Sequence, residues 1–409
     1  MKSDLDQLME KYNLDAILIT GPSQHNPPMT YLTGIIHMTG GDLIKKRGSD
    51  PILFYNPMER DEAAKTGFET KNLADYRFDE LMKISNGSIL QASILRYEKM
   101  LTEYGLSSGR IGIYGKLDVG SAFEIFSGIE DKLPEVEFVG QLGDSLMMKA
   151  MATKDADEVE RIRAMGVITT SVVNQVAEFL TSQISKNGML VDSKGDPILV
   201  KDVKNKINLW LAESGVENPE GTIFAIGRDA GVPHSTGNPN DILYLGQTIV
   251  FDIFPAEAGG GYFYDFTRTW CLGYAPDEVV EVYEDVLGVY QTIESELEVN
   301  ALCSQYQDRT CELFEEKGHP TIKSNPQTQE GYVHSLGHGV GLNIHEYPRF
   351  STNTKEDRLE PGSVVTVEPG LYYPERGMGV RLENTIWVRP DGEMEVLADY
   401  PLDLILPVK

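Results

Sequence analysis

Two aspartates in the second half of the chain occupy positions where a carboxylate is costly to bury. Asp252 ends the apolar segment 247–251, and Asp265 lies in the segment that returns after the Gly259–Gly261 turn. A single strand-end aspartate beside glycines is usually only a turn former. Two of them in otherwise apolar β segments need a compensating charge, because an unpaired buried carboxylate is expensive. A divalent metal ion would supply that charge.

Three of the seven histidines lie in the glycine-rich segment Gly331–Glu346, at His334, His338 and His345. Glycines on both sides of His338 allow the backbone or a ligand to approach closely. A glycine-rich turn with incidental histidines is the simplest alternative, but such clustering is unexpected by chance in a chain with so few histidines. The segment therefore offers an imidazole ligand to a metal.

Two glutamates, Glu368 and Glu383, interrupt or end apolar strands further along the chain. Alone, they would be interpreted as a solvated sheet face. With the aspartates they make four carboxylates beside one imidazole, a set that suits Mn²⁺ and tolerates Co²⁺, Fe²⁺ or Zn²⁺. Five side chains exceed what one ion usually takes, so two ions about 3.5–4 Å apart fit better.

The elements that must position these residues form separate blocks of helix and strand, which is typical of an α+β domain over residues 155–409. Asp155 and Glu158 match a capping box that begins a long helix. We expect further helices near 200–214, 277–299 and 304–317, and β-rich blocks at 221–274 and about 330–400.

Residues 1–150 show a different pattern, in which strands alternate with helices. Expected strands are 15–20, 51–56, 110–115 and 136–140, and expected helices are 88–106 and 117–133. This alternation predicts a smaller α/β domain. It contains no phosphate loop, nucleotide fingerprint or acid–base cluster.

Composition limits the classes of function. With 36 basic and 63 acidic residues the formal charge is -27, which disfavours nucleic acids and anionic membranes as partners. The three cysteines form no C-x-x-C pair, and the N-terminal residues lack an apolar signal core, so we expect a cytoplasmic protein. No run approaches the roughly 18 apolar residues of a membrane span.

The residues described above resemble those of the pita-bread metallopeptidases: aminopeptidase P, prolidase, creatinase and, more distantly, methionine aminopeptidase. The resemblance spans about 155–400 and rests on these motifs: Asp252, Asp265 with Thr267-Arg268-Thr269, Gly337-His338-Gly339, Glu368-Pro369-Gly370 and Arg381-x-Glu383. The first half resembles the creatinase-type N-terminal domain. In one departure, the two aspartates stand two residues farther apart than is usual in the family, which we expect to lengthen only the turn between them.

The resemblance implies a role for each candidate ligand. Asp252 would hold one ion, His338 and Glu368 the other, and Asp265 and Glu383 would bridge the two. A water acidified by both ions would attack the scissile carbonyl. Glu368 would take the proton of that water and deliver it to the leaving nitrogen.

An outer set of residues is also implied by the resemblance. His234 would contact the substrate and His345 would stabilise the tetrahedral oxyanion, a role worth about 3 kcal/mol for one well-aimed donor. His334, Arg381 and Tyr372 would line the site on the proline side. The alternative for this set is that its members only support the ligands.

The activity implied is hydrolysis of the bond between an N-terminal residue and proline, in dipeptides or in longer peptides, by a homodimer that holds two divalent ions. Mn²⁺ is the simplest choice of ion. One alternative is a metal-dependent lyase or hydrolase of a small non-peptide substrate on the same fold. A metal-free binding module is disfavoured, because such relatives lose ligands.

Overall fold

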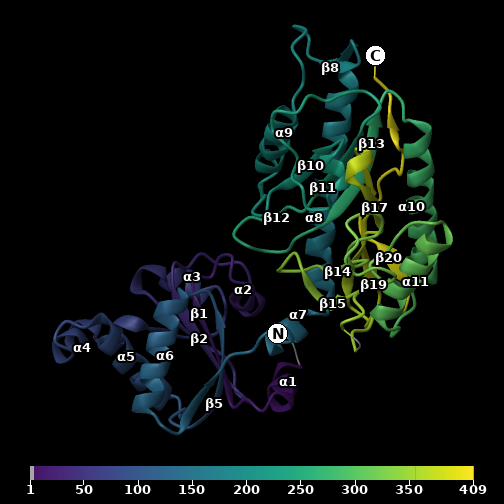
Figure 1. The fold of residues 1–409 in the computed structure, drawn as a ribbon. Coiled ribbons are helices and arrows are strands. Elements are labelled where there is room, and N and C mark those ends of the chain that lie inside the picture. The colour runs from purple at the N-terminus through teal and green to yellow at the C-terminus, as the bar shows by residue number, and fades with distance from the viewer. Residues whose placement is uncertain (1–3, 355, 409) are drawn as a thin grey trace. The chain divides into compact units, whose positions relative to one another are not determined.

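The computed structural model describes residues 4–354 and 356–408. Its residues cluster into two compact units, one comprising the residues up to Met151 with Gly259–Gly261, and the other Ala152–Ala258 with the residues from Tyr262 onward. Figure 1 shows the elements of each unit. Among the described residues, no helix combines the length and the apolar character that crossing a membrane would require.

A six-stranded mixed sheet, in the order β4-β3-β2-β1-β5-β6, forms the centre of the first unit. Apolar side chains of α5 and α6 contribute to its core with those of the sheet. The strands and helices expected from the alternating pattern are confirmed. The elements are α1 (Leu5–Lys11), β1 (Ala16–Gly21), α2 (Pro27–Thr33), β2 (Gly41–Lys46), β3 (Ile52–Tyr55), α3 (Arg60–Ala64), β4 (Glu69–Asn72), α4 (Phe78–Ile84), α5 (Ile89–Glu103), β5 (Gly109–Gly115), α6 (Val119–Lys132), β6 (Val136–Val139) and α7 (Leu146–Met151).

Strand β2 was not expected, because its sequence contains two charged residues that turn out to be buried, Asp42 and Lys45. The Tyr97 hydroxyl donates to Asp42 at 2.6 Å, and Lys45 donates to Asp6 at 2.5 Å. These partners remove much of the cost of burying charge. A hydrophobic pattern cannot anticipate them, since both partners lie far away in the sequence.

The second unit holds four long helices and several small sheets. The helices are α8 (Ala156–Ser182), α9 (Val200–Glu213), α10 (Asp277–Glu296) and α11 (Cys303–Glu316). The strands are β7 (Ile184–Lys186), β8 (Met189–Val191), β9 (Val216–Glu217), β10 (Thr222–Ile226), β11 (Thr248–Ile253), β12 (Ala256–Glu257), β13 (Phe266–Leu272), β14 (His338–Gly339), β15 (Glu346–Arg349), β16 (Val364–Val367), β17 (Gly370–Tyr373), β18 (Met378–Arg381), β19 (Asn384–Val388), β20 (Met394–Val396) and β21 (Ile405–Leu406).

Helix α8 begins at the predicted capping box. The Asp155 side chain accepts from the Glu158 N–H, and the Glu158 side chain accepts from the Asp155 N–H. These bonds satisfy backbone groups that have no partner inside the helix. The other three helices predicted for this unit are also present, so all four are confirmed, with ends that differ from expectation by a few residues.

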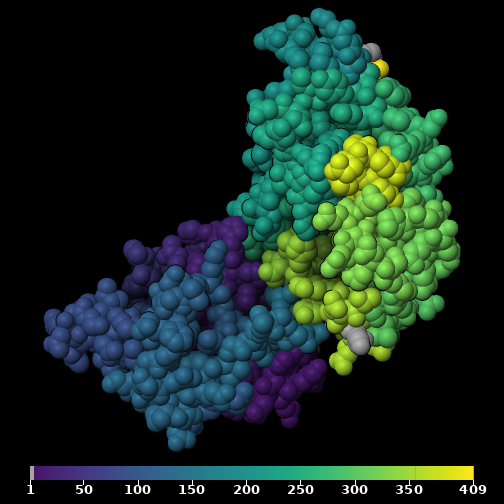
Figure 2. Space-filling view, viewed as in Figure 1, coloured from purple at the N-terminus to yellow at the C-terminus, as the bar shows by residue number. Residues whose placement is uncertain are grey.

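Two sheets of this unit carry the candidate ligands, one in the order β10-β11-β13-β21 and one in the order β15-β14-β16-β19-β20. A large apolar core joins α10 and α11 to β16, β18 and β19. The segment that follows β20 lies at the surface beside α10 (yellow in Figure 2), where the Tyr283 hydroxyl donates to the Leu402 carbonyl. The candidate ligands lie where the two sheets meet, since Thr267 of β13 contacts Glu383, which precedes β19.

Candidate metal centre

Strand register places Asp252 and Asp265 on one face of the β10-β11-β13-β21 sheet. β11 and β13 are antiparallel, with Asp252 opposite Thr267. Asp265 lies two residues before Thr267, and side chains alternate along a strand, so both carboxylates project to the same face. This register agrees with the expectation that an even insertion between the aspartates preserves the face that each shows. Both residues are buried.

Strand β14 carries His338 between two glycines that the fold requires. A Cβ on Gly337 would lie 2.1 Å from the carbonyl oxygen of Thr366, and one on Gly339 would lie 2.1 Å from that of Tyr347. Larger residues would therefore collide with neighbouring backbone. The close approach expected from the glycines is confirmed, and the backbone makes it on both sides of His338.

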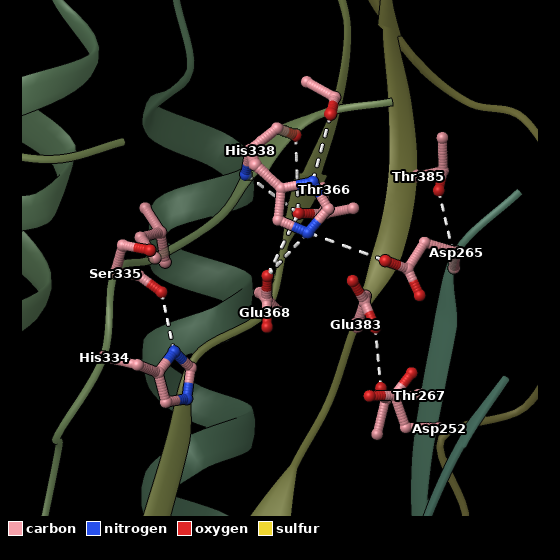
Figure 3. Close-up of polar contacts among 12 residues, drawn as sticks. Asp252, Asp265, Thr267, His334, Ser335, His338, Thr366, Glu368, Glu383 and Thr385 are labelled. Atoms are coloured by element: carbon pink, nitrogen blue, oxygen red, sulfur yellow. Dashed lines mark hydrogen bonds and ion pairs between the residues drawn. The ribbon is translucent and has the colours of Figure 1, made fainter. Parts of the chain in front are cut away.

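The protonation of His338 follows from its neighbours. Its Nδ1 lies 3.0 Å from the Gly339 carbonyl, which can only accept, so this nitrogen carries a proton. Its Nε2 points toward Asp265 Oδ2 at 3.6 Å and Glu368 Oε1 at 3.3 Å, as Figure 3 shows. An Nε2 lone pair facing two carboxylate oxygens is unfavourable unless a cation, either a proton or a metal ion, lies among them. Metal-ligating histidines are typically held in this way through their other nitrogen.

The two glutamates come from adjacent strands of the other sheet. Glu368 follows β16 and Glu383 precedes β19, and these antiparallel strands pair Val367 with Asn384. Thr267 ties Glu383 to the sheet of the aspartates: its carbonyl accepts from the Glu383 N–H at 3.1 Å, and its hydroxyl donates to Glu383 Oε2 at 2.6 Å. This connection brings the carboxylates of both sheets into one cluster.

Two buried oxygens of the cluster, Asp252 Oδ1 and Glu383 Oε1, have no hydrogen-bond partner among the described residues. In addition, Asp265, His338 and Glu383 each offer a ligand atom within 4.8 Å of the others. Buried acceptors without donors are unfavourable, and a divalent cation that prefers oxygen and imidazole ligands satisfies them. These residues therefore fit a divalent metal site.

The carboxylates of the cluster repel one another. Burial, followed by the charge of Glu383, raises the pKa of Asp265 well above its usual value. Burial and the charges of Glu368 and Asp252 likewise raise the pKa of Glu383. Burial also acts to raise the pKa of Glu368, but the hydrogen bond and the charge of His338 outweigh it and bring this pKa to about 2. A positive charge at this position thus favours the ionised form of Glu368, and a cation among the carboxylates would favour ionisation of Asp265 and Glu383 as well.

Arg381 joins Asp252 to Tyr372 and His334 through a chain of hydrogen bonds. Its guanidinium donates to Asp252 Oδ2 at 2.6 Å and to the Tyr372 hydroxyl oxygen at 2.7 Å. His334 Nε2 lies 2.9 Å from that hydroxyl, and its Nδ1 lies 2.7 Å from the Ser335 carbonyl. Since the carbonyl only accepts, Nδ1 carries the proton and Nε2 accepts from Tyr372. Burial lowers the pKa of His334, which agrees with this neutral form.

The two remaining histidines of the predicted outer set are exposed. The His345 ring packs edge-on against that of His338, with centroids 4.3 Å apart. Neighbouring groups shield part of the His345 ring from water, and this desolvation, together with the charge of His338, lowers the pKa of His345 to about 4. Arg381 also donates to the carbonyl of Pro233 at 3.3 Å, so the residue that precedes His234 contacts the chain of hydrogen bonds described above.

Some residues that hold the candidate ligands had no role in the sequence prediction. The Thr366 hydroxyl accepts from the His338 N–H at 3.1 Å and lies 3.3 Å from Glu368 Oε1. The Arg268 guanidinium is fully buried and donates to the Glu383 carbonyl at 2.8 Å. Both are polar residues inside apolar strands that also carry or adjoin a ligand, and this is the signal by which they could have been found.

Comparison with known proteins supports the same conclusion. The model of metallopeptidase family M24 matches residues 160–390. The Xaa-Pro dipeptidase of Pyrococcus furiosus is 26% identical over 396 residues, which cover 96% of this chain and 97% of that protein. That of Pyrococcus horikoshii is 26% identical over 388 residues, covering 94% and 93%.

Solved structures share the fold over nearly the whole chain. A dipeptidase from Pyrococcus horikoshii OT3 has a TM-score of 0.76 at 23% identity and covers 99% of both chains. The X-Pro aminopeptidase from Thermotoga maritima MSB8 has a TM-score of 0.73 at 21% identity, covering 97% of this chain and 99% of that chain. These matches confirm the predicted fold class, an α+β pita-bread catalytic domain preceded by a smaller α/β domain. With its family model matched over more than half of its length, this chain belongs to metallopeptidase family M24.

Proposed function

We propose that this chain hydrolyses the bond between an N-terminal residue and proline, using two divalent metal ions held by Asp252, Asp265, His338, Glu368 and Glu383. The observation that supports this most is the His338 Nε2 lone pair, which faces buried carboxylates from two sheets. The substrate class is supported by the Xaa-Pro dipeptidases, which align with 96% and 94% of this chain. Both of these relatives are named Xaa-Pro dipeptidases, which favours the dipeptidase form over the aminopeptidase form. Mn²⁺ suits this oxygen-rich set best, and Co²⁺, Fe²⁺ and Zn²⁺ are the alternatives.

Bound ions would supply Lewis acidity and an acidified water at this site. Side chains of the protein would transfer the proton and stabilise the oxyanion. Glu368, whose Oε1 lies 3.3 Å from His338 Nε2, would accept a proton from the attacking water and pass it to the leaving nitrogen. His345 is neutral at physiological pH and keeps an N–H that can donate to the developing oxyanion.

The outer residues would hold the substrate. An Xaa-Pro bond is a tertiary amide without an N–H, so a site for it needs no acceptor at that position. His334, Tyr372 and Arg381 form one rigid chain of hydrogen bonds that ends on Asp252, and we place it on the proline side. His234 is exposed and follows Pro233, whose carbonyl accepts from Arg381, and we propose that it contacts the substrate directly.

The test is hydrolysis of Ala-Pro and of Ala-Pro-Ala by chelated protein, before and after adding Mn²⁺. We expect Mn²⁺-dependent cleavage of Ala-Pro, since the two Pyrococcus relatives described above are named Xaa-Pro dipeptidases. Cleavage of the tripeptide alone would make the enzyme an aminopeptidase. If neither peptide were cleaved with Mn²⁺, Co²⁺, Fe²⁺ or Zn²⁺, the peptide substrate would be wrong, and a lyase or hydrolase of a small non-peptide molecule would take its place.

His345→Ala should lower kcat by about 100-fold, because removing one oxyanion donor costs roughly 3 kcal/mol. The KM for Ala-Pro should change much less, since the contact forms mainly in the transition state. Steady-state kinetics of the Mn²⁺-loaded variant measure both. The matched control is His37→Ala, which removes an exposed histidine of the first unit. A large rise in KM with little loss of kcat would instead assign His345 to substrate binding.

A further inference from the structure

One glutamine of helix α11 contacts the segment that leads into the candidate ligand His338. Gln307 is 2% exposed and lies on the inner face of the helix. Its Oε1 accepts from the Leu336 N–H at 2.6 Å and from the Tyr332 hydroxyl at 3.1 Å. Its Nε2 donates to the His334 carbonyl at 3.3 Å. A single side chain thus contacts three alternate residues of the segment.

These contacts reach the candidate ligands through Leu336. The Leu336 N–H donates to Gln307, and the Leu336 carbonyl accepts from the Glu368 N–H at 2.8 Å. The peptide groups of Leu336 are therefore held from two sides, by a helix and by a candidate ligand. His338 follows two residues later. A shift of Leu336 would displace the ligands of both β14 and β16.

An amide is the side chain that fits this position. The Leu336 N–H needs an acceptor and the His334 carbonyl needs a donor, and glutamine provides both without charge. An apolar side chain would leave the Leu336 N–H and the His334 carbonyl without this partner, which is unfavourable inside the protein. A glutamate would keep the acceptor and, when ionised, lose the donor.

We propose that Gln307 is a positioning residue of the metal centre, which sets the places of His338 and Glu368 through the backbone of Leu336. It touches neither metal nor substrate. The inference rests on the proposed ligand set, because it concerns how two of those ligands are held. Partners that orient metal ligands typically change metal affinity by 10–100-fold when they are removed.

The experiment compares Mn²⁺ binding by the chelated full-length protein and its variants, using isothermal titration calorimetry. Gln307→Met should weaken the Kd for Mn²⁺ by about 10–100-fold. Gln307→Glu keeps the acceptor for Leu336 and should bind Mn²⁺ more tightly than Gln307→Met. The matched control is Thr310→Val on the next turn of α11, where a fully buried hydroxyl donates to the Tyr306 carbonyl of the same helix.

Thr310→Val should lower the Tm and leave the Kd for Mn²⁺ within about twofold of the wild-type value. A wild-type Kd in Gln307→Met, or an equal loss of affinity in Thr310→Val, would overturn the positioning role. If Gln307→Met does not fold, Gln307→Glu is compared directly with Thr310→Val, and equal affinities would reject the proposal. Absence of Mn²⁺ binding by the wild-type protein would instead reject the ligand set itself, and the positioning role with it.

Discussion

Glu383→Gln should reduce hydrolysis of Ala-Pro by about a thousandfold and, at the same time, stabilise the chelated protein. The loss of activity follows because a neutral amide cannot bridge two cations, and several kcal/mol of transition-state stabilisation disappear at 1.36 kcal/mol per tenfold. The gain in stability follows from burial and from the repulsion by Glu368 and Asp252, which together raise the pKa of Glu383. Removing that buried charge should add roughly 1–3 kcal/mol to the free energy of unfolding.

Urea denaturation of chelated protein at pH 7 measures this gain, and Ala-Pro hydrolysis with Mn²⁺ measures the loss. Thr267 can still donate to the amide oxygen that replaces Glu383 Oε2, so the surrounding structure should persist. The control is Glu375→Gln, an exposed glutamate whose side chain is 83% accessible. Wild-type activity in Glu383→Gln would contradict the proposed ligand set. A destabilised chelated variant would show that Glu383 is not under electrostatic strain.

Lys154→Met should destabilise the protein by about 3–5 kcal/mol, because it breaks a buried ion pair and leaves one charge uncompensated. Lys154 Nζ lies 2.8 Å from Glu346 Oε2, and the two side chains are 2% and 0% accessible. The other oxygen of Glu346 accepts from the Asn343 N–H at 2.9 Å. Glu346 directly follows His345, so kcat should fall along with stability.

Urea denaturation of Lys154→Met, Glu346→Gln and the double variant measures the coupling between the two residues. The double variant should regain part of the loss, since no unpaired charge remains. Arg309→Met serves as control, because its pair with Glu296 is 37% and 40% accessible and should contribute less than about 1 kcal/mol. Equal losses in Lys154→Met and Arg309→Met would contradict the assigned role of burial.

Much of the fold was predictable from local sequence. The capping box of Asp155 and Glu158 marked the start of α8, and helical spacing identified α9, α10 and α11. Strand β2 was not predicted, because its charged residues Asp42 and Lys45 are buried against partners that lie far away in the sequence. Short helices such as α2 and α3 were not predicted, because a few residues are too short a segment to show a hydrophobic periodicity.

The candidate site was predictable to a similar extent. Carboxylates in apolar strands could be recognised from the sequence because burying an unpaired carboxylate is costly. The histidines could be recognised because three of them cluster among glycines. The sequence does not single out the residues that support the ligands, because threonine, glutamine and lysine occur in many positions that have no role in a site. Thr267, Gln307 and Lys154 acquire their roles only through hydrogen bonds to residues that lie far along the chain.

The sequence by itself determined the kinds of ligand, the positions of Asp252 and Asp265 in neighbouring apolar β segments, and the glycines that His338 needs. Only the tertiary structure decided which atoms meet. It turned the His338 Nε2 toward carboxylates of two sheets and bound Arg381 to Asp252. The physical reason is that side-chain type and alternation are local properties, whereas hydrogen-bond partners and burial depend on how distant strands and helices pack.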